Sequence, residues 1–161
     1  MLETLLYPET VAVIGASRNP EKVGYAFMHN LTRGGFKGTI VPINLEASEI
    51  LGVKCYKSLA DYGGKVDLSV VVVGAKYAKQ AIRDSIDASA KTIIVITAGF
   101  KEVGSKGAEA EKELVELCQA HGVRMMGPNC LGVLNTQHAM NATFAPTVPP
   151  PGHISVISQS G

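Results

Sequence analysis

The stretch VAVIGASRNPEKVGYAF, residues 11–27, joins a short apolar run to a glycine turn and the start of a helix. The β-branched residues of the run suit a strand that is buried on both faces of a sheet. Gly15 ends the run where the chain must turn sharply, and a helix that begins near Glu21 would direct its unpaired N–H groups back at the turn. This pattern predicts an anion site, and in an α/β protein the usual anion is a nucleotide phosphate.

The glycine spacing differs from that of an ordinary NAD-binding domain. The fingerprint G-x-G-x-x-G places three glycines directly after the strand, whereas the next glycine after Gly15 is Gly24. An NAD domain also carries Asp or Glu at the end of its second strand, and here Thr39–Ile43 is followed by Asn44. Both differences argue against an NAD- or NADP-dependent oxidoreductase. A turn that uses glycine for geometry alone is the plain alternative.

Apolar runs alternate with amphipathic helical patterns along the chain. We predict further strands at Thr39–Ile43, Asp67–Val73, Thr92–Thr97 and Val123–Met126, and helices at Glu21–Arg33, Ala78–Ala88 and Ala108–His121. The region Leu45–Tyr62 indicates a short strand or a helical turn on the sheet edge. The alternation predicts an α/β fold, a doubly wound parallel Rossmann-like sheet of about five strands, with ligands outside the carboxyl ends of the strands.

Glycines follow most of the predicted strand ends, namely Gly15, Gly74, Gly99 and Gly127. One such glycine is ordinary turn chemistry, and short connections alone could account for all of them. Several glycines at one edge of a sheet favour a ligand that lies flat against the backbone.

Charge and cysteine content exclude several classes of partner. The net charge of +1 indicates neither nucleic acid nor an anionic membrane surface as a partner. No apolar run approaches the roughly 20 residues that span a bilayer, and we see no secretion signal. The three cysteines form no C-x-x-C pair, and the four histidines share no spacing. We therefore predict a cytoplasmic protein with no metal site.

The composition of the chain changes after its last predicted strand. Residues 135–152 contain the run TVPPPG, which is typical of a stiff proline-rich linker. Residues 153–161 begin with the apolar run HISVIS and end in a second phosphate-type turn. We predict a nucleotide-type domain at 1–134, a linker at 135–152, and the first strand and turn of a truncated, flavodoxin-like second domain at 153–161.

Six segments occur in the order and spacing of one family: VAVIGASRNPEKVGYAF, GTIVPIN, EILGVKCYKSL, ITAGF, GPNCLGVLN and SQSG. Nearly the whole chain resembles the CoA-binding domain of the nucleoside-diphosphate-forming acyl-CoA synthetases. These include ADP-forming acetyl-CoA synthetases and the succinyl-CoA synthetase α subunit. The segments GPNCLGVLN and SQSG are much more restrictive than a single glycine loop.

The resemblance implies a CoA site along the sheet edge. The phosphates of the 3′-phospho-ADP portion would lie at Gly15, Ala16, Ser17 and Arg18, beside Lys22, Val23 and Gly24, and the nucleotide would border Pro42 and Asn44. Pantetheine would follow Thr97, Ala98 and Gly99, next to Phe100, and its thiol end would lie toward Pro128, Asn129 and Cys130. Val73 and Gly74 would form a wall, although succinyl-CoA synthetases usually carry Val-Pro there.

Two of these residues also have other interpretations. Arg18 offers a planar fork that suits phosphate, but an arginine on a solvated surface is equally ordinary. Cys130 invites a nucleophile hypothesis, yet no histidine lies next to it in sequence, and the resemblance places it beside the CoA thiol instead. We assign no catalytic residue in this chain.

The resemblance implies that the full-length protein is an acid–CoA ligase, which makes acyl-CoA, ADP and phosphate from an acid, CoA and ATP with Mg. The family's reaction passes through a phosphohistidine of the second domain, which has no counterpart here. Ser158, Ser160 and Gly161 match the loop that receives it. We therefore expect this chain to bind CoA without turnover, with the remaining synthetase domains or a β-type subunit as partners. The sequence leaves open whether the protein forms homo-oligomers.

The alternative function is that of a non-catalytic CoA- or acyl-CoA-sensing region of a protein acetyltransferase.

Overall fold

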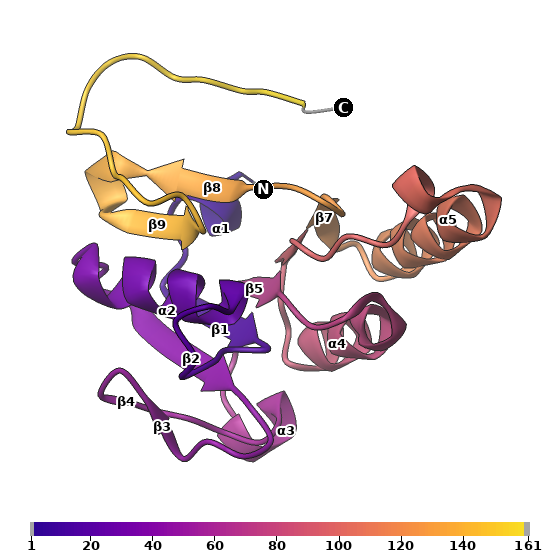
Figure 1. Ribbon diagram of the computed structural model, residues 1–161, viewed down its shortest axis with the longest axis horizontal. Coiled ribbons are helices and arrows are strands. Elements are labelled where there is room, and N and C mark those ends of the chain that lie inside the picture. The colour runs from indigo at the N-terminus through magenta and orange to yellow at the C-terminus, as the bar shows by residue number, and fades with distance from the viewer. Residues whose placement is uncertain (1, 160–161) are drawn as a thin grey trace.

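The computed structural model describes residues 2–159, and a parallel sheet of five strands runs through its centre (Figure 1). The strands are β1 (Thr10–Ile14), β2 (Thr39–Ile43), β5 (Leu68–Val71), β6 (Thr92–Val95) and β7 (Arg124–Met126). Their order is β2-β1-β5-β6-β7, and every pairing is parallel. The direction of strand addition reverses between β1 and β5, which is where doubly wound sheets bind ligands. The predicted α/β sheet is confirmed.

Helices cover both faces of this sheet (Figure 1). The helices are α2 (Val23–Arg33) on one face and α4 (Ala75–Asp87) and α5 (Ser105–Ala120) on the other. The valines of β1 join the apolar cluster under α2, whereas Ala12 and Ile14 join the cluster under α4. Successive side chains of a strand alternate between faces, so a strand covered on both sides is apolar throughout.

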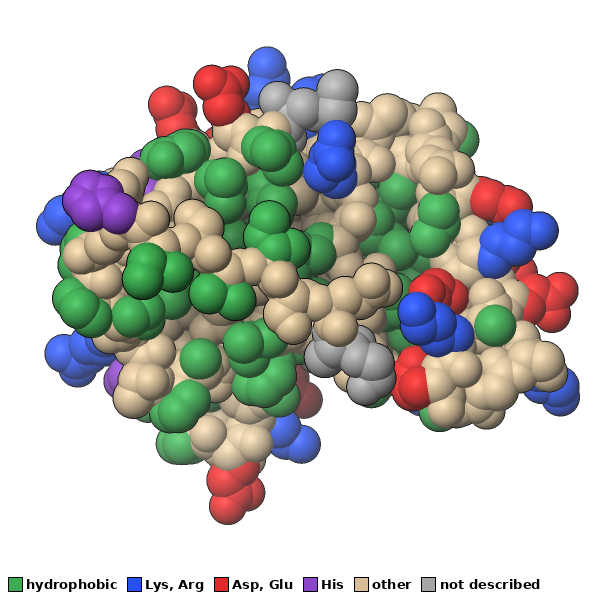
Figure 2. All heavy atoms as spheres, turned by 90° about the horizontal axis from the view of Figure 1, so that it is seen from above, with side chains coloured by type: hydrophobic (Ala, Val, Ile, Leu, Met, Phe, Trp, Pro, Cys, Tyr) green, Lys and Arg blue, Asp and Glu red, His purple; other side chains and the backbone are tan. Residues whose placement is uncertain are grey.

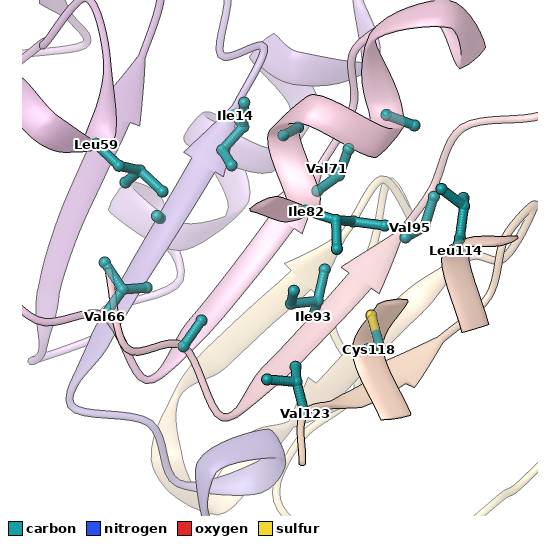
Figure 3. Close-up of a cluster of buried hydrophobic side chains, with 14 of the residues drawn as sticks. Ile14, Leu59, Val66, Val71, Ile82, Ile93, Val95, Leu114, Cys118 and Val123 are labelled. Carbon is teal, nitrogen blue, oxygen red and sulfur yellow. The ribbon is translucent and has the colours of Figure 1, made fainter. Parts of the chain in front are cut away.

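Figure 3 shows the cluster on the face that α4 and α5 cover. Val71 of β5 and Ile93 and Val95 of β6 pack here with Ile82 of α4 and Leu114 of α5, and all five side chains are buried. Burying an aliphatic side chain of this size contributes about 1.5–3 kcal/mol. The cluster therefore fixes the strands relative to α4, which begins at the edge where ligands are expected.

Two helices begin closer to their glycine turns than the sequence pattern predicts. Helix α4 starts at Ala75 rather than Ala78, and α5 starts at Ser105 rather than Ala108. Their N-cap positions are glycines, and neither helix has a side-chain cap. Because Ser, Thr, Asp and Asn caps are the sequence signal for a helix start, these two starts carry no such signal.

Several short helices, strands and turns lie outside the five-stranded sheet. They are α1 (Glu3–Leu6), β3 (Glu49–Ile50), β4 (Val53–Lys54), α3 (Leu59–Tyr62) and the 3-10 turns η1 (Lys101–Val103) and η2 (Thr136–His138). The region Leu45–Tyr62 thus contains both a strand pair and a helical turn, where its pattern predicts one or the other. Within this region, Tyr56 lies beside β2 and forms a parallel bridge to Ile43.

The linker predicted from Asn135 onward is wrong in its first part. Strands β8 (Gly132–Asn135) and β9 (Met140–Thr143) form an antiparallel hairpin. Met140 and Ala142 are fully buried in the cluster under α2. The Asn30 side-chain amide of α2 donates to the carbonyl oxygens of Thr143 and Ala145 at 2.8 and 3.0 Å. The hairpin is therefore part of the core of the sheet domain.

The segment from residue 144 to residue 159 contains no helix or strand. The strand predicted at His153–Ser158 has no pairing partner among the described residues, and Ile154, Val156 and Ile157 are exposed. Ser160 and Gly161 lie outside the described residues. Figure 2 views this side from above, with hydrophobic side chains over the half that contains β8 and β9.

Residues 2–159 contain neither a candidate membrane span nor a candidate metal cluster. No helix among them is long and apolar enough to cross a membrane. No group of three His, Cys, Asp or Glu side chains lies close enough together to hold a metal ion.

Candidate nucleotide-binding site

The turn after β1 is built around close contact between two glycines. Gly15 has a φ of +95°, which side chains disfavour, and its amide donates to the Ile43 carbonyl at 3.1 Å. A Cβ added to Gly24 would lie 2.0 Å from the Gly15 carbonyl oxygen. No side chain fits in that space, so the first turn of α2 lies directly against the turn. The sequence predicts this strand–turn–helix unit, and the structure has it.

The first turn of α2 has no capping side chain among the described residues. Its N-cap residue, Lys22, makes no side-chain capping bond, and no acidic residue lies in the first turn. Helix α4 begins in the same way at Gly74, directly after the neighbouring strand β5. Helix N-termini present unpaired N–H groups and positive potential. Two such ends therefore converge on the point where the strand order reverses.

Local side-chain hydrogen bonds fix the loop between β1 and α2. Ser17 Oγ accepts from the amide of Asn19 at 3.0 Å, and Asn19 Oδ1 accepts from the amide of Glu21 at 2.9 Å. Each side chain accepts from an amide two residues ahead, as in Ser and Asx turns. Arg18, between them, is exposed and makes no ion pair within the range the structure describes. The loop thus holds its shape and leaves a cation in solvent.

Asn44 ties the ends of β1 and β2 together. Its Nδ2 donates to the Ala16 carbonyl at 2.8 Å, and its Oδ1 accepts from the amides of Glu46 and Ala47, both at 2.9 Å. An amide side chain has one carbonyl and two N–H donors, so most of this capacity is used inside the protein. Asn44 lies at the predicted position, but its side chain supports the loop rather than standing free.

Thr97 ties the ends of β5, β6 and β7 together in the same manner. Its hydroxyl donates to the Val73 carbonyl at 2.6 Å, and its own carbonyl accepts from the amide of Asn129 at 3.0 Å. The turns at Val73–Gly74, Thr97–Gly99 and Pro128–Cys130 are therefore joined along one edge. This is the set of turns that the sequence predicts to lie together.

Two predicted residues present no side chain to this edge. Pro42 is buried within β2, and its carbonyl accepts from the amide of Tyr56 at 3.0 Å. Phe100 is 2% exposed and belongs to the cluster under α4 and α5. Ser158 lies in the exposed segment after residue 143. Ligand contacts of all the predicted site residues stay predictions.

Cys130 lies at the far end of the edge and has the properties of a structural thiol. Its Sγ lies 3.5 Å from the Val95 carbonyl oxygen, to which it can donate. Burial raises the pKa of the Cys130 thiol, so the protonated form dominates at neutral pH. Because the thiolate is the nucleophile, this environment does not support covalent chemistry at Cys130.

Sequence reasoning missed two residues whose side chains shape the loops by binding main-chain amides. Asn19 and Glu102 both accept hydrogen bonds from main-chain amides at the edge. Asn19 could have been found from sequence, because an Asn in a loop commonly forms an Asx turn by accepting from the amide two residues ahead. Glu102 follows Gly99 by three residues in the sequence, and nothing in that local pattern marks it.

A cavity of about 550 Å³ lies along the outer edge of β7 and reaches Gly127, directly after that strand. It is lined by residues of β7 and α5 together with Lys91 and Thr4. None of its lining residues belongs to the turns after β1, β5 or β6.

Comparison with known proteins gives one consistent result. A family model described as a CoA binding domain matches residues 9–136. ADP-forming acetate–CoA ligase I from Archaeoglobus fulgidus is 46% identical over 160 residues, which make up 99% of this chain and 23% of that protein. The α subunit of ADP-forming acetate–CoA ligase II from Pyrococcus furiosus is 44% identical over 161 residues, which make up 100% of this chain and 35% of the subunit.

A solved structure agrees with these sequence matches. Acetyl-coenzyme A synthetase 1 of Ca. Korarchaeum cryptofilum, in complex with phosphate and ADP, superposes with a TM-score of 0.87 at 43% identity. The match covers 91% of this chain and 31% of that chain. The chain therefore spans about a third of the length of this synthetase, and 23% and 35% of the two curated relatives.

Proposed function

The chain belongs to the family of CoA-binding domains, and we propose that it binds coenzyme A along the carboxyl edge of its sheet. The observation that supports the position is the contact between Gly24 and the Gly15 carbonyl, where any Cβ would fill the space. This contact places the uncapped start of α2 against the turn after β1, inside the matched range. The residues present thus fit an anionic nucleotide.

Each end of the ligand has a counterpart along the edge. The phosphates of the 3′-phospho-ADP portion would take the amides at the start of α2, and Arg18 and Lys22 would supply positive charge. The pantetheine arm is long, thin and uncharged, and it needs backbone more than side chains. Gly74, Ala98 and Gly127 are small and exposed at successive strand ends, so they leave room for the arm.

The activity of the whole protein is proposed from its relatives. They are named as ADP-forming acetate–CoA ligases, and this chain covers a part of each. We propose that the full-length protein is a cytoplasmic acid–CoA ligase that converts acid, CoA and ATP to acyl-CoA, ADP and phosphate, with Mg bound to the nucleotide. The chain itself supplies the CoA site and no catalytic residue. Ser158, Ser160 and Gly161 would contribute to the site only with the remaining domains or a β-type subunit.

Arg18 offers the most direct test of where the phosphates bind. We expect Arg18→Ala to weaken CoA binding about tenfold, because a charge-assisted contact to phosphate contributes about 1.5 kcal/mol or more. The loss should shrink when dephospho-CoA replaces CoA, if the guanidinium binds the 3′-phosphate. Isothermal titration calorimetry of both proteins with both ligands gives the four affinities.

Arg33 provides the matched control, because it is an exposed arginine at the opposite end of the same helix. Arg33→Ala should leave CoA affinity within about twofold, since exposed charges beyond a Debye length of about 10 Å contribute little. An Arg18→Ala protein that binds CoA as tightly as the wild type would contradict the proposed phosphate position. So would an equal loss in Arg33→Ala.

A further inference from the structure

The loop after β6 is held by a carboxylate that the proposed site does not include. Glu102, the middle residue of η1, reaches back over its own turn, and its Oε1 accepts from the Gly99 amide. Its Oε2 accepts from the Phe100 amide at 3.2 Å. One carboxylate therefore holds two consecutive main-chain amides, with one oxygen on each.

The held loop is also confined from the sides. Gly99 has a φ of +107°, and a Cβ added there would lie 3.2 Å from Cβ of Ala75, the first residue of α4. The Phe100 ring is anchored in the core. On the other side, the Lys101 amide donates to the Glu111 carboxylate at 3.3 Å. The amides of three consecutive residues are thus held by two carboxylates.

Charge supports this hold at neutral pH. Glu102 is exposed, and the hydrogen bond from the Gly99 amide lowers the pKa of its carboxyl group. Lys101, the neighbouring cation, lowers that pKa further. Lys101 also lies 4.0 Å from the Glu111 carboxylate, which holds the Lys101 amide. The carboxylate form, which accepts both bonds, persists until the pH falls through the lowered pKa.

We propose that Glu102 is a positioning residue that holds the Ala98–Phe100 backbone in the shape that receives the uncharged arm of CoA. The inference rests on the proposed function. Ala98 is exposed and lies between Thr97, which joins this turn to its neighbours, and the two held amides. A free loop would have to be ordered at each binding event, and this ordering costs conformational entropy. Because Glu102 holds this loop in advance, the arm binds without that cost. The phosphates bind elsewhere, so Glu102 does not affect their binding.

The test compares two ligands on the same variant. Glu102→Ala should weaken CoA binding about tenfold, whereas adenosine 3′,5′-bisphosphate, which lacks the pantetheine arm, should bind within about twofold of the wild type. Glu102→Gln should give a smaller loss, because its carbonyl can accept from one amide but its NH₂ cannot accept from the other. Calorimetry with both ligands measures each affinity.

Glu113→Ala is the matched control, because Glu113 is also an exposed glutamate in a hydrogen bond, to Lys79 at 2.6 Å on α4. It should change neither affinity. Equal losses for both ligands in Glu102→Ala, or no loss for either, would overturn the positioning role while leaving CoA binding intact. Failure of the wild-type chain to bind CoA at all would instead overturn the proposed function beneath it.

Discussion

Replacing Gly24 by alanine is expected to abolish most CoA binding, with a loss of about 100-fold or more. The new Cβ would lie 2.0 Å from the Gly15 carbonyl oxygen, 3.0 Å from the Gly15 carbonyl carbon and 3.2 Å from Ala16 Cα. All three are backbone atoms, which cannot rotate aside as a side chain could. Helix α2 would have to move away from the turn and carry its N-terminal amides with it. The same overpacking should lower the free energy of unfolding by about 1–3 kcal/mol.

Gly152→Ala provides the control for this change. A Cβ at Gly152 has only the Pro150 carbonyl oxygen nearby, at 4.0 Å, and its φ is not in the region reserved for glycine. Chemical denaturation and CoA titration of both variants separate the loss of fold from the loss of site. Wild-type affinity in a folded Gly24→Ala protein would show that the start of α2 takes no part in binding.

Ending the chain at Leu134 is expected to prevent stable folding, whereas ending it at Thr147 should leave stability nearly unchanged. The shorter chain lacks β9, whose Met140 and Ala142 are fully buried against the cluster under α2. Removing one buried Met side chain costs about 2–5 kcal/mol. Losing the whole strand approaches the total stability of a domain, about 5–15 kcal/mol. Circular dichroism during urea unfolding measures both chains.

The longer chain is the matched comparison, because it keeps both carbonyl groups that accept from the Asn30 side chain, those of Thr143 and Ala145. Among the described residues it removes only the exposed ones at 148–159. A chain that ends at Leu134 and unfolds with the same midpoint and slope as the longer one would refute the structural role of the hairpin.

The parallel sheet could be predicted from sequence because its strands are covered on both faces. Continuous β-branched runs such as those of β1 and β6 have few other uses in a chain of this composition. Strand β2 was predicted with its observed bounds, Thr39–Ile43. The starts of α4 and α5 could not be placed, because their caps are glycines rather than side chains that announce a helix.

The β8–β9 hairpin could not be predicted from the local sequence pattern. Its second strand, MNAT, has polar side chains at alternate positions and is followed by proline-rich chain, so it resembles an ordinary loop. In the structure Asn141 and Thr143 are buried and hydrogen-bonded to each other at 2.6 Å. This bond is local, and Asn141 Nδ2 stays buried without a hydrogen-bond partner among the described residues. The alternating polar pattern therefore gives no sign that the strand belongs to the core.

The positions of the candidate site could be predicted, but not the roles of its side chains. The topology alone brings the turns after parallel strands to one edge, so Asn44 and Thr97 lie at the strand ends where the pattern predicts them, while their contact with a ligand stays a prediction. Both side chains bind backbone carbonyls of other turns, namely those of Ala16 and Val73. Those partners are distant in sequence, and no local pattern records them.

The central claim, that this edge binds CoA rather than a nicotinamide dinucleotide, is tested most directly by parallel calorimetric titrations of the chain with CoA and with NAD. Residue 44 is an inward-turned amide where an NAD domain carries an acidic group for the ribose. We predict saturable binding of CoA, with NAD at least about 100-fold weaker. Tighter binding of NAD than of CoA by the folded chain would contradict the account.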